Sequence, residues 1–290
     1  MSAFEGVLTA MVTPFTDEGE LDLPACRNLA AHLLSHGSDG LVLAGTTGES
    51  PTLDDAEKLA LFEAVRAEVG EGVPLIAGTG SNDTRHTVEL TKRAEETGVD
   101  GALVVTPYYN NPNPAGIDAH FEAVAAATQL PIVIYNIPAR SVKNIPPDQL
   151  DQLAQIPNVV AVKQANDAEL GQVRKLEELA GNDNVFADCL ERGGVGGICV
   201  ASHLVGEPMR ELADAFAAGD ADRGRSIDEE LQPLYEALAT TSNPIPVKTA
   251  LGMLGICSER MRLPMVPATD EQRTTIRAAL TAQGLEPTHG

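Results

Sequence analysis

The sequence predicts an α/β fold, a (β/α)8 or TIM barrel with a helical region appended at its C-terminus. Eight short apolar runs alternate with segments of helical periodicity, and continuous apolar runs of this length are typical of strands buried on both faces of a parallel sheet. The runs are Val7–Val12, Gly40–Ala44, Pro74–Ala77, Gly101–Val105, Pro131–Ile134, Val159–Val162, a weak run at Leu179–Ala180, and Gly197–Ala201. The clearest helical segments between them are residues 25–36, 54–69, 84–97, 117–128 and 147–155.

The ends of these runs distinguish a barrel from the alternative, a doubly wound sheet. A doubly wound sheet concentrates its functional residues at one crevice, whereas a barrel collects them from many strand ends on its carboxyl face. Small or polar residues follow nearly every run, at positions 13–14, 45–48, 78–80, 106–109, 135–136, 163–164 and 181–183. This spread favours the barrel.

The C-terminal part of the chain is expected to be helical. After residue 201 the apolar pattern predicts helices at 207–218, 221–240, 245–254 and 271–282. We therefore expect a catalytic barrel over residues 1–205 and helices packed on it over residues 206–290, with no long linker.

Composition excludes several classes of partner. Apolar residues make up 43% of the 290 residues, aromatic residues only 3%, and Trp is absent, so the expected core is large and aliphatic. The formal net charge of −22 repels nucleic acid and anionic membrane surfaces, so neither is an expected partner. No apolar stretch reaches the roughly 18 residues of a membrane-spanning helix.

Cysteine usage and the first residues predict a cytoplasmic protein. Cys26, Cys189, Cys199 and Cys257 have no paired spacing, and three of them lie in apolar stretches. Buried free thiols are therefore expected, as in a reducing compartment. Residues 1–14 lack the basic start and the apolar core of a signal peptide.

Lys163 is the strongest candidate for a nucleophile. It ends the apolar run Val159–Val162, whereas the other lysines lie in polar or mixed surroundings or beside proline. Apolar neighbours withdraw water from an amine and favour its neutral, nucleophilic form. The alternative is a lysine that merely leaves the sheet for solvent.

Two other strand ends carry residues that could bind or protonate an acid. Gly45–Ser50 reads GTTGES, and exposed backbone N–H groups at such a turn bind carboxylate or phosphate; the alternative is an ordinary loop in which Ser50 or Asp54 caps the next helix. Tyr135 could shuttle protons beside a Schiff base, or could be a core tyrosine. Arg140 offers a fork for a carboxylate.

Three further features predict no additional chemistry. The histidines show no HExxH motif and no paired ligand spacing, so no catalytic metal is expected. No other cofactor is predicted. Gly193–Gly197 precedes a strand, whereas a phosphate cradle lies between a strand and a helix, so a tight turn is expected. Lys248 lies beyond the barrel pattern and is expected to be structural.

The order and spacing of several motifs resemble the dihydrodipicolinate synthase / N-acetylneuraminate lyase family over essentially the whole chain. Arg140 and Tyr108–Asn110 favour the synthase branch, because sialic acid lyases and sugar-acid aldolases usually lack this arginine. The motifs that carry the resemblance are Gly45–Ser50, Thr106–Asn110, Tyr135–Arg140, Val162-Lys163, Asn243–Lys248 and Arg262–Pro264.

The resemblance implies roles for individual residues. Lys163 matches the Schiff-base lysine. Tyr135, Thr47 and Tyr109 match a proton relay in which Tyr109 comes from a neighbouring subunit. The substrate-binding positions of the family match Thr46 and Thr47 for the pyruvate carboxylate, Arg140 for the carboxylate of the second substrate, and Gly181 and Ile198 for the backbone that lines the site.

The implied reaction is the condensation of pyruvate with L-aspartate-4-semialdehyde to 4-hydroxy-tetrahydrodipicolinate, a lyase reaction of lysine and diaminopimelate biosynthesis. The resemblance also implies a cytoplasmic homotetramer. One alternative is another pyruvate-dependent class I aldolase, of sugar-acid or N-acetylneuraminate type. The other is a barrel that binds ligands without turnover, and the complete set Lys163, Tyr135 and Thr47 argues against it.

The sequence departs from the family pattern in three places. Arg140–Val142 replaces a more usual Arg-Thr-Gly, and Gln164 stands where Glu is common. The segment between Lys163 and Gly181 is shorter than usual, which weakens the prediction of the seventh strand and of the role of Gly181.

A regulatory pocket also maps onto this chain. In lysine-inhibited members of the family, an inter-subunit pocket binds lysine. His86 falls where a carboxylate normally holds the α-ammonium group of lysine, and Lys58 falls where histidine is common, so we expect little inhibition unless Asp55 turns into the pocket. The mapped positions are Ser50, Pro51, Asp55, Lys58, Asn82, His86 and Tyr108.

Overall fold

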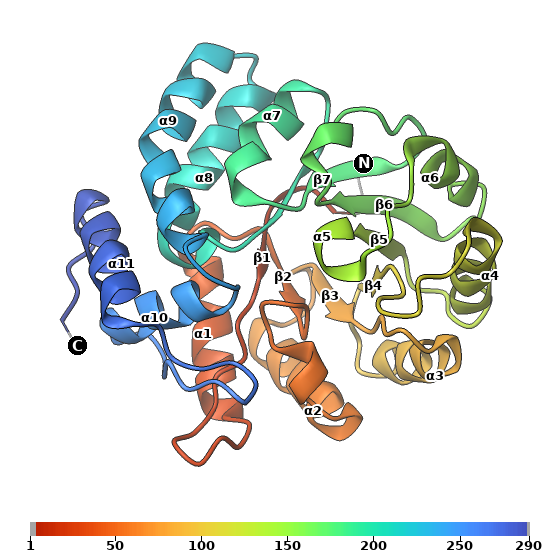
Figure 1. Ribbon diagram of the computed structural model, residues 1–290, viewed down its shortest axis with the longest axis horizontal. Coiled ribbons are helices and arrows are strands. Elements are labelled where there is room, and N and C mark those ends of the chain that lie inside the picture. The colour runs from red at the N-terminus through yellow and green to blue at the C-terminus, as the bar shows by residue number, and fades with distance from the viewer. Residues whose placement is uncertain (1–3, 289–290) are drawn as a thin grey trace.

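The computed structural model describes residues 4–288 and contains a closed barrel of eight parallel strands (Figure 1). Each strand pairs with the next one in the sequence, and β8 pairs with β1, so the sheet has no free edge. The predicted (β/α)8 barrel is confirmed. The strands are β1 (Gly6–Ala10), β2 (Gly40–Leu43), β3 (Leu75–Gly78), β4 (Gly101–Val105), β5 (Ile132–Asn136), β6 (Val159–Gln164), β7 (Glu177–Ala180) and β8 (Gly196–Cys199).

The helices of the structure include all nine that the periodicity predicts, with small differences at their ends. Two short helices, α5 and α7, were not predicted. The helices are α1 (Leu23–Ser35), α2 (Asp55–Val69), α3 (Thr84–Glu95), α4 (Pro114–Ala125), α5 (Pro138–Ser141), α6 (Pro147–Leu153), α7 (Phe186–Glu191), α8 (Ser202–Ala217), α9 (Ala221–Leu238), α10 (Ile245–Met253) and α11 (Asp270–Ala282).

The connection between β6 and β7 is reduced. A single 3₁₀ turn, Asp167–Glu169, stands where a barrel usually has a helix. The weak apolar run before Gly181 nevertheless forms β7, which pairs with β6 and β8. The shortened segment therefore lacks a helix between β6 and β7, but β7 itself is present.

The core has two layers. Inward-facing side chains at alternate strand positions fill the barrel, and they are almost all aliphatic. A larger layer lies between the strands and the helices and holds the fully buried Phe15, Phe62, Phe121 and Phe186. The inner layer contains Leu8, Ala10, Val42, Ile76, Leu103, Val133, Ala161, Leu179 and Ile198.

The C-terminal helices α9, α10 and α11 pack beside α8 on one side of the barrel (Figure 1). The boundary at residue 206 stays a proposal. It falls inside α8, next to a kink at Val205, whose backbone angles are not helical.

Cysteine burial agrees with the sequence. Cys26, Cys189 and Cys199 are buried free thiols, and Cys257 is half-buried. Burial raises the pKa of Cys26 and of Cys189 to about 12, so neither thiol is poised to react. Within residues 4–288, no helix is both long and apolar enough to cross a membrane.

His203 links the start of α8 to two strand ends. Its ring is buried; Nε2 accepts from the Val12 N–H at 3.1 Å, and Nδ1 lies 2.8 Å from the Val200 carbonyl oxygen. This pairing requires a neutral ring with its proton on Nδ1. Burial lowers the pKa of His203 from 6.5 to about 4.

The pKa of His203 predicts how stability changes with acid. Between pH 6.5 and 4 the unfolded chain binds a proton at His203 that the folded chain does not bind. The contribution of the neutral His203 ring to the free energy of unfolding is therefore complete above pH 6.5 and is lost as the pH falls towards 4. His203→Gln removes the titration. The gap in unfolding free energy between wild type and this variant should shrink by roughly 3 kcal/mol over that range.

Urea unfolding at several pH values measures this gap. Gln129→Asn, a change at an exposed residue that does not titrate, is the control and should follow the wild-type pH dependence. A gap between wild type and His203→Gln that stays constant from pH 7 to 4 would contradict the assignment.

Candidate active site

Lys163 lies on β6 and points into the barrel. Ala161, two positions earlier, belongs to the inner core layer, and side chains two apart on a strand face the same way. Lys163 is paired in register with Tyr135 on β5, and its Nζ lies 4.4 Å from the centre of the Tyr135 ring. Both residues are only 5% exposed. The alternative of a lysine that leaves the sheet for solvent is therefore wrong.

The loop after β2 presents Thr46 and Thr47. The loop is tight: Ala44 and Glu49 both have positive φ angles, of 50° and 55°. A Cβ on Gly48 would lie 3.1 Å from the Ala44 Cα, so a larger residue there would have to displace its neighbours by a few tenths of an ångström. Thr47 is 2% exposed, and its Oγ1 accepts a hydrogen bond of 2.9 Å from Asn243.

A buried ion pair joins the loop after β2 to helix α10. Lys248 Nζ on α10 lies 2.6 Å from Glu49 Oε1 and also donates to the Arg260 carbonyl oxygen at 2.6 Å. Glu49 Oε2 accepts from the Arg262 N–H at 3.0 Å. Burial lowers the pKa of Lys248, and the nearby Glu49 opposes this shift. The expectation that Lys248 is structural agrees with these contacts.

Arg140 projects from the short helix α5, which directly follows β5. Ser141 holds the segment through bonds of 2.8 Å from its Oγ to the Ile137 and Lys143 carbonyl oxygens. Val142 has a φ of 64°, a left-handed conformation that is unfavourable for a β-branched residue and normal for glycine. Arg140 is exposed and donates to the Asn243 carbonyl oxygen at 3.3 Å.

Gln164, the other departure, is a fully buried part of the polar network behind the site. Its Oε1 accepts from Asn136 Nδ2 and from the Asn166 N–H, both at 3.0 Å. A carboxylate oxygen would accept the same two bonds, so the departure preserves this network.

A cavity of about 750 Å³ brings most of the predicted site residues together. Gly181 lies at its wall, where a Cβ would approach the Gln164 carbonyl oxygen to 2.6 Å. The predicted residues that line this cavity are Thr46, Thr47, Tyr135, Arg140, Lys163 and Gly181.

Two predicted residues do not line this cavity. Ile198 is fully buried in the inner core layer of the barrel. Tyr109 is 90% exposed, with a φ of 69°. Within one chain, the Tyr109 side chain is exposed and lines neither of the two cavities of the site.

The residues that line the cavity but were not predicted as site residues include Asp183, Tyr235 and Asn243. Asp183, after β7, accepts from the Val200 and Ala201 N–H groups at 2.8 and 3.0 Å, and burial raises its pKa. Tyr235 on α9 and Asn243 before α10 come from the C-terminal helices. The polar strand end 181–183 was a signal for Asp183, whereas nothing local marks Tyr235.

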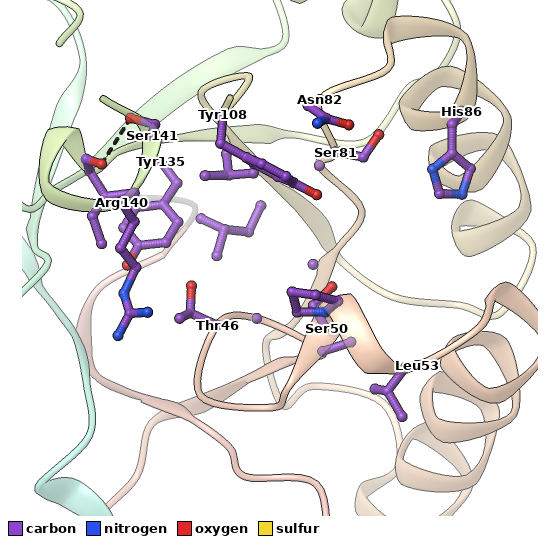
Figure 2. A pocket seen from close by; sticks show the side chains of 18 of the residues that line it. Thr46, Ser50, Leu53, Ser81, Asn82, His86, Tyr108, Tyr135, Arg140 and Ser141 are labelled. Carbon is purple, nitrogen blue, oxygen red and sulfur yellow. Dashed lines mark hydrogen bonds between the residues drawn. The ribbon is translucent and has the colours of Figure 1, made fainter. Parts of the chain in front are cut away.

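A second cavity, of about 460 Å³, shares Thr46, Tyr135 and Arg140 with the first. Figure 2 shows these three residues at one end of it and His86 at the other, with Tyr108 between them. Of the mapped regulatory positions, all except Asp55 line this cavity.

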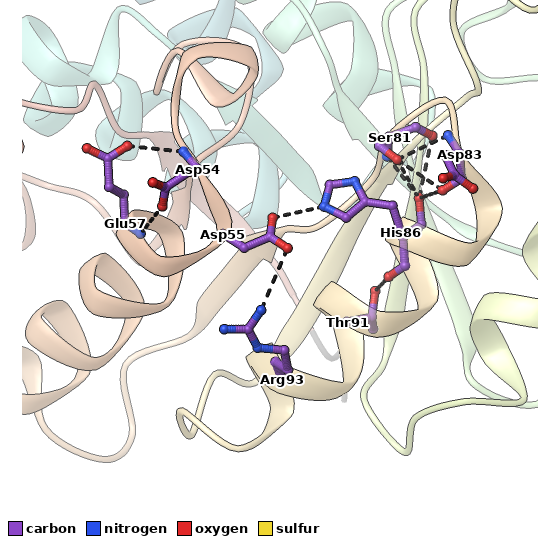
Figure 3. A network of polar contacts seen from close by, with 9 residues as sticks. Asp54, Asp55, Glu57, Ser81, Asp83, His86, Thr91 and Arg93 are labelled. Atoms are coloured by element: carbon purple, nitrogen blue, oxygen red, sulfur yellow. Dashed lines mark hydrogen bonds and ion pairs between the residues drawn. The ribbon is translucent and has the colours of Figure 1, made fainter.

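Asp55 is engaged outside that cavity. Figure 3 shows it between His86 and Arg93. One carboxylate oxygen of Asp55 lies 2.8 Å from His86 Nε2, and the other lies 3.7 Å from Arg93 Nη1. Lys58 lines the cavity and is 6% exposed, and burial lowers its pKa. Asp83 also lines the cavity, and its Oδ1 accepts from the Arg85 N–H at the start of α3.

The fold and the site define a class: a TIM-barrel enzyme with an interior lysine facing a tyrosine, and with threonines and an arginine at the carboxyl ends of its strands. A family model described as the Dihydrodipicolinate synthetase family matches residues 3–283. The chain belongs to this family.

Individual proteins and solved structures of this family are similar to the chain over nearly its whole length. A 4-hydroxy-tetrahydrodipicolinate synthase of Moorella thermoacetica is 48% identical over 287 residues, which cover 96% of this chain and 98% of that protein. The structure of DHDPS from Cyanidioschyzon merolae with lysine bound has a TM-score of 0.94 and 38% identity, and covers 98% of this chain and 100% of that one. A monomeric dihydrodipicolinate synthase variant has a TM-score of 0.93 and 38% identity, and covers 98% of both chains.

Proposed function

We propose that the chain condenses pyruvate with L-aspartate-4-semialdehyde to 4-hydroxy-tetrahydrodipicolinate through an imine on Lys163. The observation that carries the proposal is the buried Lys163 amine beside Tyr135 in a cavity lined by Thr46, Thr47 and Arg140. The names of the curated relatives support the same substrates.

The reaction follows from the chemistry of a buried amine. The Lys163 nitrogen attacks the ketone carbon of pyruvate, and the carbonyl oxygen leaves as water. The resulting imine withdraws electrons, so a methyl proton leaves to give an enamine, which forms the new carbon–carbon bond with the aldehyde. The amino group of the semialdehyde then displaces Lys163 and closes the ring.

The surrounding hydroxyls move the protons and hold the acids. Tyr135 and Thr47 line the cavity beside Lys163 and act as the relay. Thr46 and Thr47 bind the pyruvate carboxylate on the loop after β2. Arg140 receives the carboxylate of the semialdehyde, since its exposed guanidinium lies at the cavity rim.

Tyr109 completes the relay from a second copy of the chain. Its 90% exposure and its absence from the lining of both cavities of its own chain support this role, because an exposed ring is available to an adjacent subunit. We therefore propose a cytoplasmic homo-oligomer, a tetramer as in the family pattern. The monomeric variant among the related structures shows that assembly can differ in this family.

The first prediction concerns Lys163. Borohydride with pyruvate should attach one pyruvate to this residue, with loss of water and gain of two hydrogens, because among residues 4–288 it is the one lysine that lines the cavity. Intact mass and peptide mapping measure the label. Lys92→Ala, a change at an exposed lysine, should label like wild type, and label retained in Lys163→Ala would refute the role.

The second prediction concerns Arg140. Arg140→Ala should weaken use of the semialdehyde by about 1.5–3 kcal/mol, roughly tenfold to a hundredfold in kcat/KM, because a charged hydrogen-bonding fork is lost. Borohydride trapping of pyruvate should change little. Arg192→Ala, a change at an arginine outside both cavities, is the control. Unchanged kcat/KM with poorer trapping would assign Arg140 to pyruvate instead.

The third prediction concerns inhibition by lysine, the ligand in the Cyanidioschyzon merolae structure. In this chain Lys58 adds a positive charge to the cavity, and Asp55 is paired with His86 and Arg93 outside it. Among the described residues that line the cavity, only Asp83 carries a carboxylate, and it already caps α3. These charges should weaken lysine binding by roughly a hundredfold or more.

Initial rates with increasing lysine test this expectation. Half-inhibition should need well above about 1 mM lysine, whereas a value at or below that concentration would contradict it. The double variant Lys58→His with His86→Glu removes the cation and supplies a carboxylate, so it should gain inhibition. Arg85→Glu adds a similar charge in an exposed part of α3 and should not.

A further inference from the structure

Asn243 is one of the residues through which the C-terminal segment contacts the loop after β2, and among the described residues it is the one that bonds to Thr47. It lies just before α10, in a segment that the barrel itself does not contain. Its side-chain Nδ2 donates to Thr47 Oγ1 at 2.9 Å, and its backbone oxygen accepts from Arg140 Nη2 at 3.3 Å. Asn243 therefore contacts both Thr47, on the loop after β2, and Arg140, on α5 after β5.

The side-chain contact has a direction. An amide NH₂ group can only donate, so Thr47 Oγ1 is the acceptor and its own proton must point elsewhere. Among residues 4–288, the structure gives the Thr47 hydroxyl no other hydrogen bond. Its proton is therefore free to be passed to or from the cavity.

The side-chain oxygen of Asn243 is a second observation that points to a functional role. Asn243 Oδ1 is buried and has no hydrogen-bond partner among the described residues. Buried polar atoms are almost always paired with protein groups or ordered water, so an unpaired amide oxygen at a cavity is suited to accept a hydrogen bond from a water molecule or a ligand. The asparagine borders the cavity that also holds Lys163 and Tyr135.

We infer that Asn243 is a positioning residue that holds the Thr47 hydroxyl as an acceptor, so that the hydroxyl proton serves the relay. The inference rests on the proposed function, since it assigns Thr47 to proton transfer. The backbone contact to Arg140 belongs to the same residue, but it does not depend on the side chain.

Two substitutions separate this role from a purely structural one. Asn243→Ala removes the donor and keeps the backbone oxygen for Arg140, so kcat should fall about tenfold or more while KM for the semialdehyde stays within about twofold. Asn243→Asp keeps the size of the side chain. Its ionised form cannot donate to Thr47, whereas its protonated form can.

The pH dependence of the rate of Asn243→Asp distinguishes the hydrogen-bonding role from a role in packing. Relative to wild type, the rate of Asn243→Asp should rise as pH falls and the introduced carboxyl becomes protonated. The rate of Asn243→Ala should show no such rise. Thr240→Ala, three residues earlier, exposed and outside the cavity, should behave as wild type.

The measurement is the exchange of pyruvate methyl hydrogens with D₂O, followed by proton NMR, together with steady-state condensation rates. Exchange needs only the imine and the relay, so it does not depend on the aldehyde. Wild type that neither exchanges nor condenses would refute the proposed function and the inference with it.

If wild type exchanges, the variants decide the inference alone. Slow exchange in Asn243→Ala, with acid recovery in Asn243→Asp, supports it. Exchange within about twofold of wild type in Asn243→Ala, or parallel pH profiles for both variants, would overturn it while the proposed function stands.

Discussion

The buried ion pair between Lys248 and Glu49 is the contact on which the site depends. Neither side chain is more than 3% exposed, and the charged atoms are 2.6 Å apart. Removing one member of such a pair leaves an unpaired buried charge, which costs about 3–5 kcal/mol. The pair joins α10 to the loop after β2, so it connects the end of the chain to a loop at the second strand.

This connection explains how a strained loop keeps its shape. Ala44 and Glu49 hold positive φ angles that non-glycine residues rarely adopt, and such conformations persist where surrounding contacts determine them. Lys248, the Arg262 N–H and the Thr13 hydroxyl bond to Glu49 or Gly48. The C-terminal segment therefore supports the site, and the barrel alone would lack the contacts of Lys248 and Arg262 to Glu49.

The sequence predicted the barrel and its central residues because those signals are local. A strand buried on both faces must be apolar, so a lysine or tyrosine at its end is conspicuous, as at Lys163 and Tyr135. Asn243 and Tyr235 could not be placed, since their proximity to the site arises from packing between segments far apart in the chain. Asp55 was expected as a possible wall of the regulatory pocket, and its pairing with His86 depends on how α2 and α3 pack.

A double-mutant cycle on Glu49 and Lys248 tests the central claim most directly. The unfolding free energies of wild type, Glu49→Gln, Lys248→Met and the double variant give the coupling between the two side chains. We expect each single change to cost about 3–5 kcal/mol and the double change to cost far less than their sum. Costs that add within about 0.5 kcal/mol would show that the pair does not hold the loop.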